Sequence, residues 1–178
     1  MSSLPPPTRN ALSAVNLFII KEVEGGLPTR RDLDRLAAWS ELHRADGLLR
    51  AELSRRLEAL TETSLLEHEA VHRLVIAPGR RLTMYQLADA LLVSRSGATR
   101  LIDRLEGRGW VARRVAPQDR RVVRAELTRE GAAAFANMSR VFAAAFDERF
   151  GGLLDDADVA ELRRVLAKLL AASPEPPR

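Results

Sequence analysis

Cysteine is absent from this chain of 178 residues. Disulfide bonds, thiolate metal sites and redox sensing through a thiol are therefore excluded. Aromatic residues are also scarce, at 4% of the chain, whereas alanine and leucine are abundant. Because alanine and leucine are strong helix formers, we expect helices to supply most of the hydrophobic core. The length suits one domain with a substantial core.

Long hydrophobic runs are missing as well. The nearest approach to a membrane span is 11–20, and Lys21, Glu22 and Glu24 follow it at once. The start of the chain has no basic leading segment and no small-residue cleavage site, so a secretion signal is not expected. We therefore predict a cytoplasmic protein that does not associate with membranes.

Sequence signatures of enzymes are absent too. There is no glycine-rich phosphate loop, no Gly-x-Ser-x-Gly motif and no cysteine nucleophile. We therefore predict no catalytic residue and no cofactor. His68 and His72 are four residues apart in a predicted helix, a spacing that can place two imidazoles on one metal ion. Since the spacing indicates no third ligand, no metal site is predicted, and a metal-sensing regulator is kept as an alternative.

The most informative stretch of the sequence is 83–128, which opens with signals for two short helices. Thr83 and Gln86 have the spacing of a capping box. Ser94 is suited to cap the second helix, because its hydroxyl can accept a hydrogen bond from a free N–H of the first turn. Apolar residues then recur at helical spacing and predict a buried face formed by Ala98, Leu101, Ile102 and Leu105.

A basic hairpin is predicted after these helices. Segments 110–115 and 122–127 have the composition of short strands, and 117–120 has that of a turn. Two helices followed by such a hairpin are typical of a winged helix-turn-helix. Nine arginines and three carboxylates lie within 94–124, a net charge of +6, whereas the whole chain carries only +4. Such a concentration is expected of a surface that faces phosphates.

Long helices are predicted on both sides of this unit. Leucines at helical spacing predict helices over 31–60 and 65–76. Thr128 can cap a helix with a phenylalanine-rich stripe, and Asp155 with Asp158 can open the last helix. The residues expected to face inward in that last helix are Val159, Leu162, Leu166 and Leu169. An amphipathic segment at 8–24 predicts an extra helix packed on the body or across a dimer, with a partner-binding arm as the alternative.

Taken together, these motifs resemble the MarR (multiple antibiotic resistance regulator) family of bacterial transcription factors. The matching motifs are Ser94-Arg95-Ser96, the run 99–106, Gly109, Asp119-Arg120-Arg121 and Leu127-Thr128-x-x-Gly131. The similarity is strong there and looser outward, covering roughly residues 33–170. It implies a mainly α fold with a small β wing, in which a winged helix-turn-helix is flanked by N- and C-terminal dimerisation helices.

The resemblance also implies a division of the chain. We expect a tail and extra helix at 1–30, the winged helix domain at 31–172 and a disordered tail at 173–178. Within the domain, 62–128 would bind DNA, while 31–61 and 129–172 would dimerise. The apolar stripes of the flanking helices are too large for the small winged unit to cover. Exposed apolar stripes of that size usually indicate association with another chain. A homodimer would read two half-sites roughly ten base pairs apart in a near-palindromic operator.

The residues expected to contact double-stranded DNA lie on the second helix and on the hairpin. The start of such a helix enters the major groove, where arginine can bind guanine. The candidates there are Ser94, Arg95, Ser96, Thr99 and Arg100. Arg104 is a further candidate, although Asp103 or Glu106 could instead neutralise it. We assign Arg113, Arg114 and Arg124 to phosphates, which supply affinity but little sequence selectivity.

The hairpin tip carries Asp119, Arg120 and Arg121. The resemblance suggests that one arginine, Arg121 first, enters the minor groove while Asp119 orients it. A narrow minor groove concentrates negative potential and attracts such a side chain. Alternatively, Asp119 only forms the turn through hydrogen bonds with local backbone.

The predicted function is that of a ligand-responsive, homodimeric transcription regulator, most simply a repressor. A small aromatic or lipophilic effector would bind between the dimer helices and the winged unit. Candidate effector residues are Trp39, His43 and His68, although Trp39 fits the core of a dimer better. The alternatives are a protein–protein interaction module built on a winged helix, and the metal-sensing regulator described above.

Overall fold

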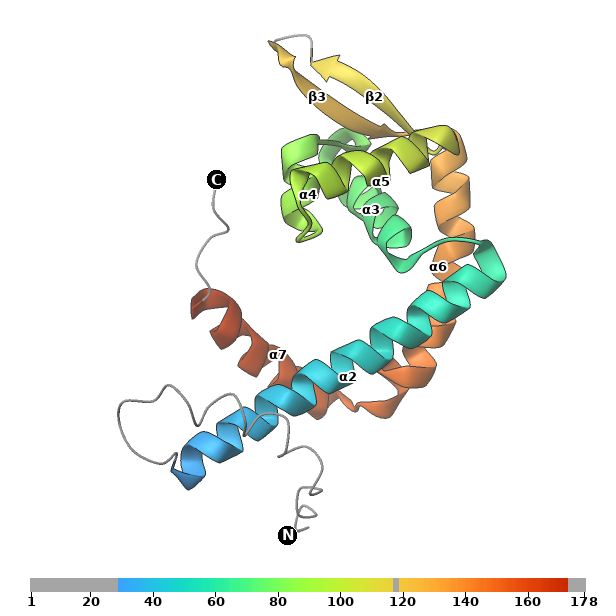
Figure 1. The fold of residues 1–178 in the computed structure, drawn as a ribbon. Coiled ribbons are helices and arrows are strands. Elements are labelled where there is room, and N and C mark those ends of the chain that lie inside the picture. Colours follow the sequence, from blue (N-terminus) through green and yellow to red (C-terminus); the bar gives the residue numbers. More distant parts are fainter. Residues whose placement is uncertain (1–28, 117–118, 173–178) are drawn as a thin grey trace. The chain divides into compact units, whose positions relative to one another are not determined.

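The computed structural model describes residues 29–116 and 119–172, and the side chains of 116 and 119–121 are outside that description (Figure 1). The predicted helix at 8–24, the predicted tail at 173–178 and the turn residues Pro117 and Gln118 lie outside the described residues. The chain divides into two compact units, and the boundary falls between Leu48 and Leu49.

The first two helices confirm the sequence-based prediction. Helix α2 spans Arg30–Thr61 and helix α3 spans Leu65–Ile76. Ser64 caps α3: its hydroxyl accepts a hydrogen bond from the backbone N–H of Glu67, and the Glu67 carboxylate accepts one from the N–H of Ser64. Because this capping box satisfies N–H groups that the first turn leaves free, the start of α3 is encoded locally.

The helix pair of the winged unit also forms as predicted. Helix α4 spans Met84–Ala90 and helix α5 spans Arg95–Gly107. Thr83 and Gln86 form the expected capping box, and Ser94 Oγ accepts a hydrogen bond of 3.1 Å from the N–H of Gly97. The loop between the helices contains Leu92, which has a left-handed backbone with φ of 53°.

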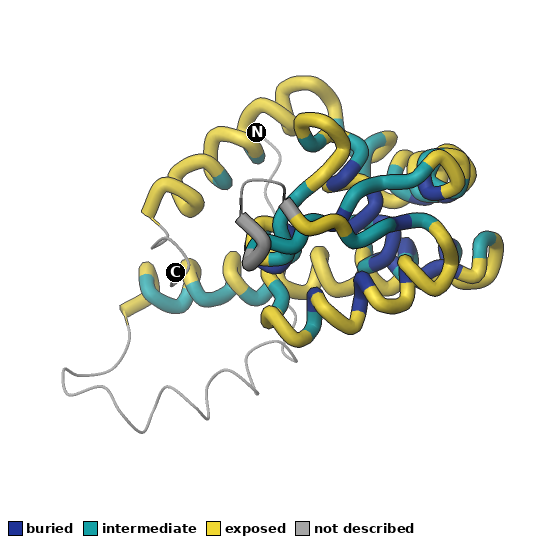
Figure 2. The backbone as a smooth tube through the Cα atoms, turned by 90° about the horizontal axis from the view of Figure 1, so that it is seen from above, coloured by how far each residue is buried: buried dark blue, intermediate teal, exposed yellow. Residues whose placement is uncertain are grey.

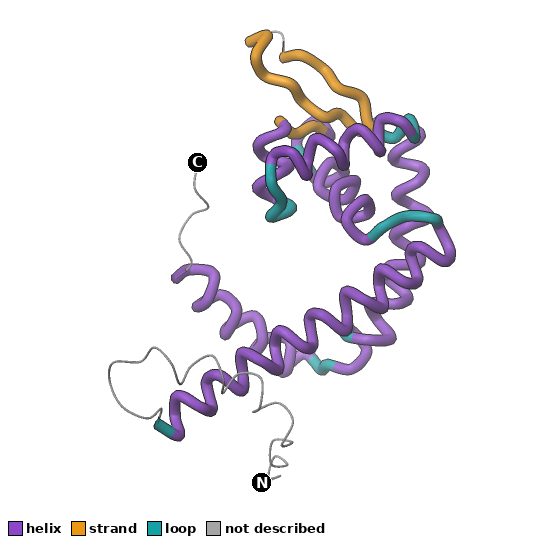
Figure 3. Tube along the Cα trace, viewed as in Figure 1, coloured by secondary structure: helices purple, strands orange, loops and turns teal. Residues whose placement is uncertain are grey.

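A three-stranded antiparallel sheet forms the wing (Figure 3). It contains β1 (Arg81–Thr83), β2 (Val111–Ala116) and β3 (Asp119–Leu127) in the order β1-β3-β2. Strand β1 was not expected, because three residues are too few to show an alternating pattern. The predicted boundary of the second strand was also wrong. Strand β3 begins at Asp119 rather than Val122, because Asp119 pairs with Ala116 beyond an irregularity in the ladder.

Two helices follow the wing. Thr128 caps α6 (Arg129–Arg149) by accepting a hydrogen bond from the N–H of Gly131, as predicted. A short 3-10 helix, Gly151–Leu153, separates α6 from α7, which spans Asp156–Ala172. Asp155 and Asp158 open α7 through two reciprocal backbone-to-carboxylate hydrogen bonds.

Helix α7 departs from the prediction in its packing. None of its residues is buried, so the stripe of Val159, Leu162, Leu166 and Leu169 does not face the interior of a single chain. Val159 and Leu169 remain 38% and 53% exposed. The apolar periodicity is present in α7, but burial of that stripe requires a further surface.

The hydrophobic core lies in the unit formed by residues 49–178. It joins the C-terminal end of α2 to α3, α4, α5, the sheet and α6, and includes Leu57, Leu74, Leu87 and Met138. Buried residues are dark blue in Figure 2. The predicted inner face of α5 is confirmed, since Ala98, Leu101, Ile102 and Leu105 are fully buried.

The fold class is the one expected, mainly α with a small β wing. No helix among the described residues combines the length and the apolar composition that a bilayer crossing requires.

Candidate nucleic-acid interface

The outer face of α5 presents the side chains that the sequence singled out. Arg95, Ser96, Thr99 and Arg100 are exposed, while the opposite face of the helix is buried. The Ser94 and Ser96 hydroxyls lie 3.1 Å apart, and Thr99 Oγ1 donates a hydrogen bond to the Arg95 carbonyl. The first turns of α5 therefore offer hydroxyl and guanidinium groups from a rigidly packed helix.

Arg113 is held by partners within the protein. Its guanidinium lies 2.7 Å from an Asp103 carboxylate oxygen and 2.8 Å from a Glu106 carboxylate oxygen, and it donates a hydrogen bond to the Thr99 carbonyl. Partial burial acts to lower the pKa of Arg113, but the bonds to Asp103 and Glu106 outweigh this effect and raise it. The guanidinium thus connects β2 to α5 as a permanent cation.

Arg104 and Arg108 also have internal partners, and neither partner was predicted. Arg104 Nε lies 3.4 Å from a carboxylate oxygen of Glu67, which is only 4% exposed. Asp103 and Glu106, the expected partners of Arg104, bind Arg113 instead. Arg108 donates a hydrogen bond of 2.8 Å to the Glu62 carbonyl. Its guanidinium also stacks 4.9 Å from the centre of the Trp110 ring.

Four other arginines of the winged unit have no carboxylate partner among the described residues. Among the described residues, no carboxylate lies within ion-pair distance of Arg95, Arg100, Arg114 or Arg124. Arg114 and Arg124 are directly opposite each other in the β2–β3 ladder, so both side chains leave the same face of the sheet. Like charges in that position repel, and a bound anion would relieve the repulsion.

The hairpin tip can be placed only by its backbone. Asp119, Arg120 and Arg121 occupy the start of β3, and their side chains lie outside the described part. Entry of Arg121 into the minor groove, and the orienting or turn-forming role of Asp119, therefore stay predictions.

Comparison with known proteins bears on this unit directly. Residues 60–122 match the model of the MarR family. Sco3205, a MarR family transcriptional regulator from Streptomyces coelicolor solved in complex with DNA, superposes with a TM-score of 0.75. It is 25% identical, and the match covers 86% of this chain and 94% of Sco3205. The winged unit of this chain matches the MarR family, and the wider fold is similar to that of MarR-family regulators.

Two further proteins are similar to this chain. A mutant of Escherichia coli MarR in complex with operator DNA gives a TM-score of 0.67 at 25% identity, over 77% of this chain and 96% of that one. The transcriptional repressor MprA of Escherichia coli (strain K12) is 48% identical over 46 residues, which are 26% of this chain. The matched stretch spans only 26% of the length of MprA.

The candidate effector residues fall in different units of the chain. Trp39 and His43 stack on each other in the unit of residues 1–48, with ring centres 5.7 Å apart, and Trp39 is 60% exposed. His68 lies in the other unit, where it is buried against the rings of Phe135 and Phe142. Its Nδ1 has no hydrogen-bond partner.

The surroundings of His68 favour its neutral form. Burial, followed by repulsion from His72, lowers the pKa of His68 to about 4. The ring of His72 lies 6.3 Å from that of His68 and stacks on Phe135. Within the described ranges, no group of three His, Cys, Asp or Glu side chains could hold a metal ion.

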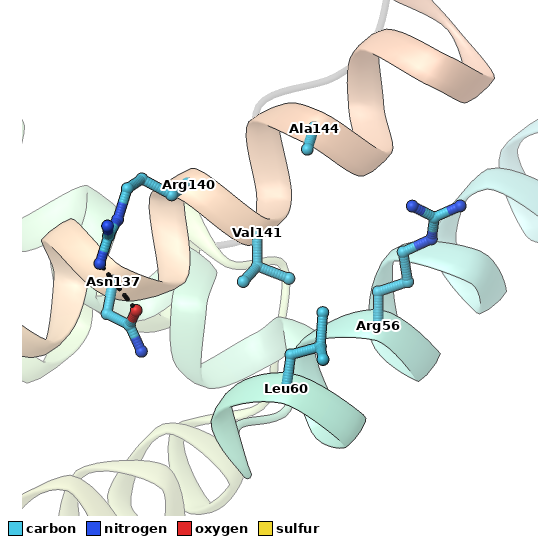
Figure 4. A pocket seen from close by; sticks show the side chains of 6 residues that line it. All are labelled: Arg56, Leu60, Asn137, Arg140, Val141 and Ala144. Carbon is cyan, nitrogen blue, oxygen red and sulfur yellow. Dashed lines mark hydrogen bonds between the residues drawn. The ribbon is translucent and has the colours of Figure 1, made fainter.

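A hollow that sequence reasoning did not find lies between the end of α2 and the middle of α6 (Figure 4). Its volume is about 370 Å³, and it is lined by Arg56, Leu60, Asn137, Arg140, Val141 and Ala144. Leu60 and Val141 point toward each other, and Arg140 donates a hydrogen bond to Asn137. Arg56 is committed to Glu52 and Glu148. The residues that line this hollow come from two helices far apart in the sequence. No local sequence pattern therefore indicates that they share a site.

Proposed function

We propose that this protein binds duplex DNA selectively and regulates transcription as a homodimeric repressor. The observation that carries the proposal is the set of four arginines on α5 and the wing without a carboxylate partner in the described residues. Arg114 and Arg124 repel each other across the strands, an arrangement that a phosphate between them would stabilise. Two similar proteins, Sco3205 and E. coli MarR, have been solved with DNA.

The arginines divide into two roles under this proposal. Arg95 and Arg100, with Ser94, Ser96 and Thr99, face the major groove, where Arg100 can bind guanine through two hydrogen bonds. Arg114 and Arg124 bind phosphates, and the tip residues Asp119, Arg120 and Arg121 approach the minor groove. Arg104 and Arg113 hold α5 against its neighbours, because their guanidinium groups already bind Glu67, Asp103 and Glu106.

Dimerisation is proposed from the exposed apolar residues of the terminal helices. Trp39 and Leu48 on α2 are 60% and 63% exposed, and Leu170 on α7 is 73% exposed. Apolar surface of this extent on helices indicates a protein interface. A two-fold dimer would place two copies of α5 about one turn of DNA apart, roughly ten base pairs.

An effector would act by shifting the dimer between two states that differ in the spacing of the two α5 helices. We place a small aromatic or lipophilic molecule in the hollow beside Leu60 and Val141, where Arg140 can bind an acidic group on it. A ligand that prefers the state with the wrong spacing of the two α5 helices releases DNA. A differential affinity of a few kcal/mol suffices for such a shift.

Selection of bound sequences from random duplex DNA tests the function. We expect near-palindromic sequences with half-sites roughly ten base pairs apart, and a relaxed preference for Arg100→Ala. The selection is repeated with aromatic and lipophilic acids present, and an effector is identified by lost enrichment. If wild-type protein enriches no sequence and ignores DNA at low salt, the winged unit is instead a protein-docking module.

A further inference from the structure

Leu92, in the loop between α4 and α5, combines a left-handed backbone with an exposed side chain. The left-handed turn ends α4: the N–H of Leu92 donates a hydrogen bond of 3.1 Å to the Asp89 carbonyl, and the N–H of Val93 donates one of 3.0 Å to the Ala88 carbonyl. Leu92 has a φ of 53°, a left-handed conformation that residues with a Cβ atom disfavour and that glycine adopts freely. Its side chain is also 89% exposed. Two other described non-glycine residues have positive φ, Glu62 and Arg80, but both are charged and suit an exposed loop.

The surroundings of Leu92 indicate what its side chain meets. It lies beside a hollow of about 370 Å³ that Tyr85, Asp89, Ser94 and Arg95 also line. The Arg95 guanidinium is 5.5 Å from the centre of the Tyr85 ring, a cation–π contact that holds this arginine next to the apolar pair. Leucine and tyrosine therefore form an exposed apolar edge directly before the start of α5.

We propose that Leu92, flanked by Tyr85, contacts the C5-methyl group of a thymine at the edge of each half-site. This inference rests on the proposed DNA-binding function and assigns that surface a specificity-determining residue. A leucine side chain cannot hydrogen-bond a base or a phosphate, and the thymine methyl is the apolar feature that the major groove offers. Arg95 and the N-terminal end of α5 fit a polyanion beside it, whereas Asp89 is the single carboxylate in the hollow.

The end of α4 requires the left-handed backbone, and the proposed contact accounts for a leucine rather than a glycine at this position. A glycine at position 92 would relax the loop but would leave the thymine methyl exposed to water. Leucine reaches the methyl group and removes it from water, which distinguishes thymine from cytosine at that position. The leucine side chain itself adds little packing to the fold, since it is 89% exposed.

The test removes the methyl group from the DNA and the side chain from the protein, separately and together. Each thymine of a selected site is replaced in turn by deoxyuridine, which lacks the C5-methyl group. We expect wild-type affinity to fall about fourfold per half-site at one position, the effect of burying about one carbon. For Leu92→Gly and Leu92→Asn, thymine and deoxyuridine at that position should bind equally.

Thermal unfolding separates this role from a structural one. Because glycine and asparagine tolerate φ near 53°, both variants are expected to melt at or above the wild-type temperature. Glu62→Gly is the matched control, because Glu62 has a similar positive φ but lies far from α5 in the sequence. This variant should still bind thymine about fourfold more tightly than deoxyuridine at that position.

The outcomes are distinguishable. If wild-type protein shows no selective DNA binding, the proposed function fails and this inference fails with it. If selective binding is present but no deoxyuridine position lowers affinity, Leu92 does not contact a methyl group. If deoxyuridine lowers the affinity of wild type and of Leu92→Gly equally, the inference is overturned in the same way. The DNA-binding function would then remain intact.

Discussion

Arg113 and Arg114 are neighbours in the sequence, yet their side chains leave opposite faces of β2. Arg113 turns toward α5 and binds Asp103 and Glu106, whereas Arg114 lies opposite Arg124 on the outer face. Composition predicts a basic surface here, because charge can be counted. It cannot separate internal ion pairs from free cations, since that depends on contacts between residues distant along the chain.

His68 gives a residue-scale prediction for pH. Its pKa is lowered from 6.5 to about 4 in the folded protein by burial and by His72. Above pH 6.5 both folded and unfolded states hold a neutral ring. As the pH falls from about 6.5 to 4, the unfolded state takes up the proton first, so the free energy of unfolding decreases, by up to about 3 kcal/mol.

Urea unfolding at several pH values measures this dependence. His68→Phe keeps an aromatic ring between Phe135 and Phe142 but cannot titrate, so its stability should change less over the same pH range. An equally steep dependence in the variant would show that other groups cause it.

At the scale of elements, the caps explain why so much of the helical framework was predictable. Ser64, Thr83, Ser94 and Thr128 each bind an N–H three residues ahead, so a few adjacent residues define the start of each helix. Strand β1 and the contact of Arg104 with Glu67 were missed. Both depend on partners far along the chain: Arg81 pairs with Glu126, and Glu67 lies on another helix.

Gly131 provides a prediction for the junction between the wing and α6. A Cβ atom at this position would collide with the backbone carbonyl oxygen of Trp110, which also accepts a hydrogen bond from the Thr128 N–H. Backbone cannot move aside as a side chain can. We therefore expect Gly131→Ala to lower the free energy of unfolding by about 3 kcal/mol or more.

Gly107→Ala is the matched control for thermal unfolding monitored by circular dichroism. A Cβ atom at Gly107, the last residue of α5, meets nothing within 4 Å. This variant should be as stable as wild type. Similar melting temperatures for the two variants would contradict the close contact at the junction.

At the scale of the whole molecule, the exposed Leu170 of α7 predicts self-association. Leu170 is 73% exposed in a single chain. A two-fold interface would bury it twice, and each buried leucine contributes about 1.5–3 kcal/mol. Leu170→Asn should therefore weaken dimerisation about 100-fold or more, as measured by sedimentation over a range of concentrations.

Lys168→Asn places the same new side chain on the same helix and should leave the dimer intact. A monomeric wild type, or equal weakening by both substitutions, would contradict the proposed interface.

If the winged-unit arginines that have no carboxylate partner among the described residues bind DNA phosphates, binding must depend steeply on salt concentration. Affinity for a selected site is measured by fluorescence anisotropy from low to moderate salt. We expect log affinity to fall steeply with log salt for wild type, and the slope for Arg114→Ala to be shallower by about 0.9 per protomer. Arg113→Ala should keep the wild-type slope and lose thermal stability instead. A flat wild-type slope, or the same change in slope for both variants, would contradict the account.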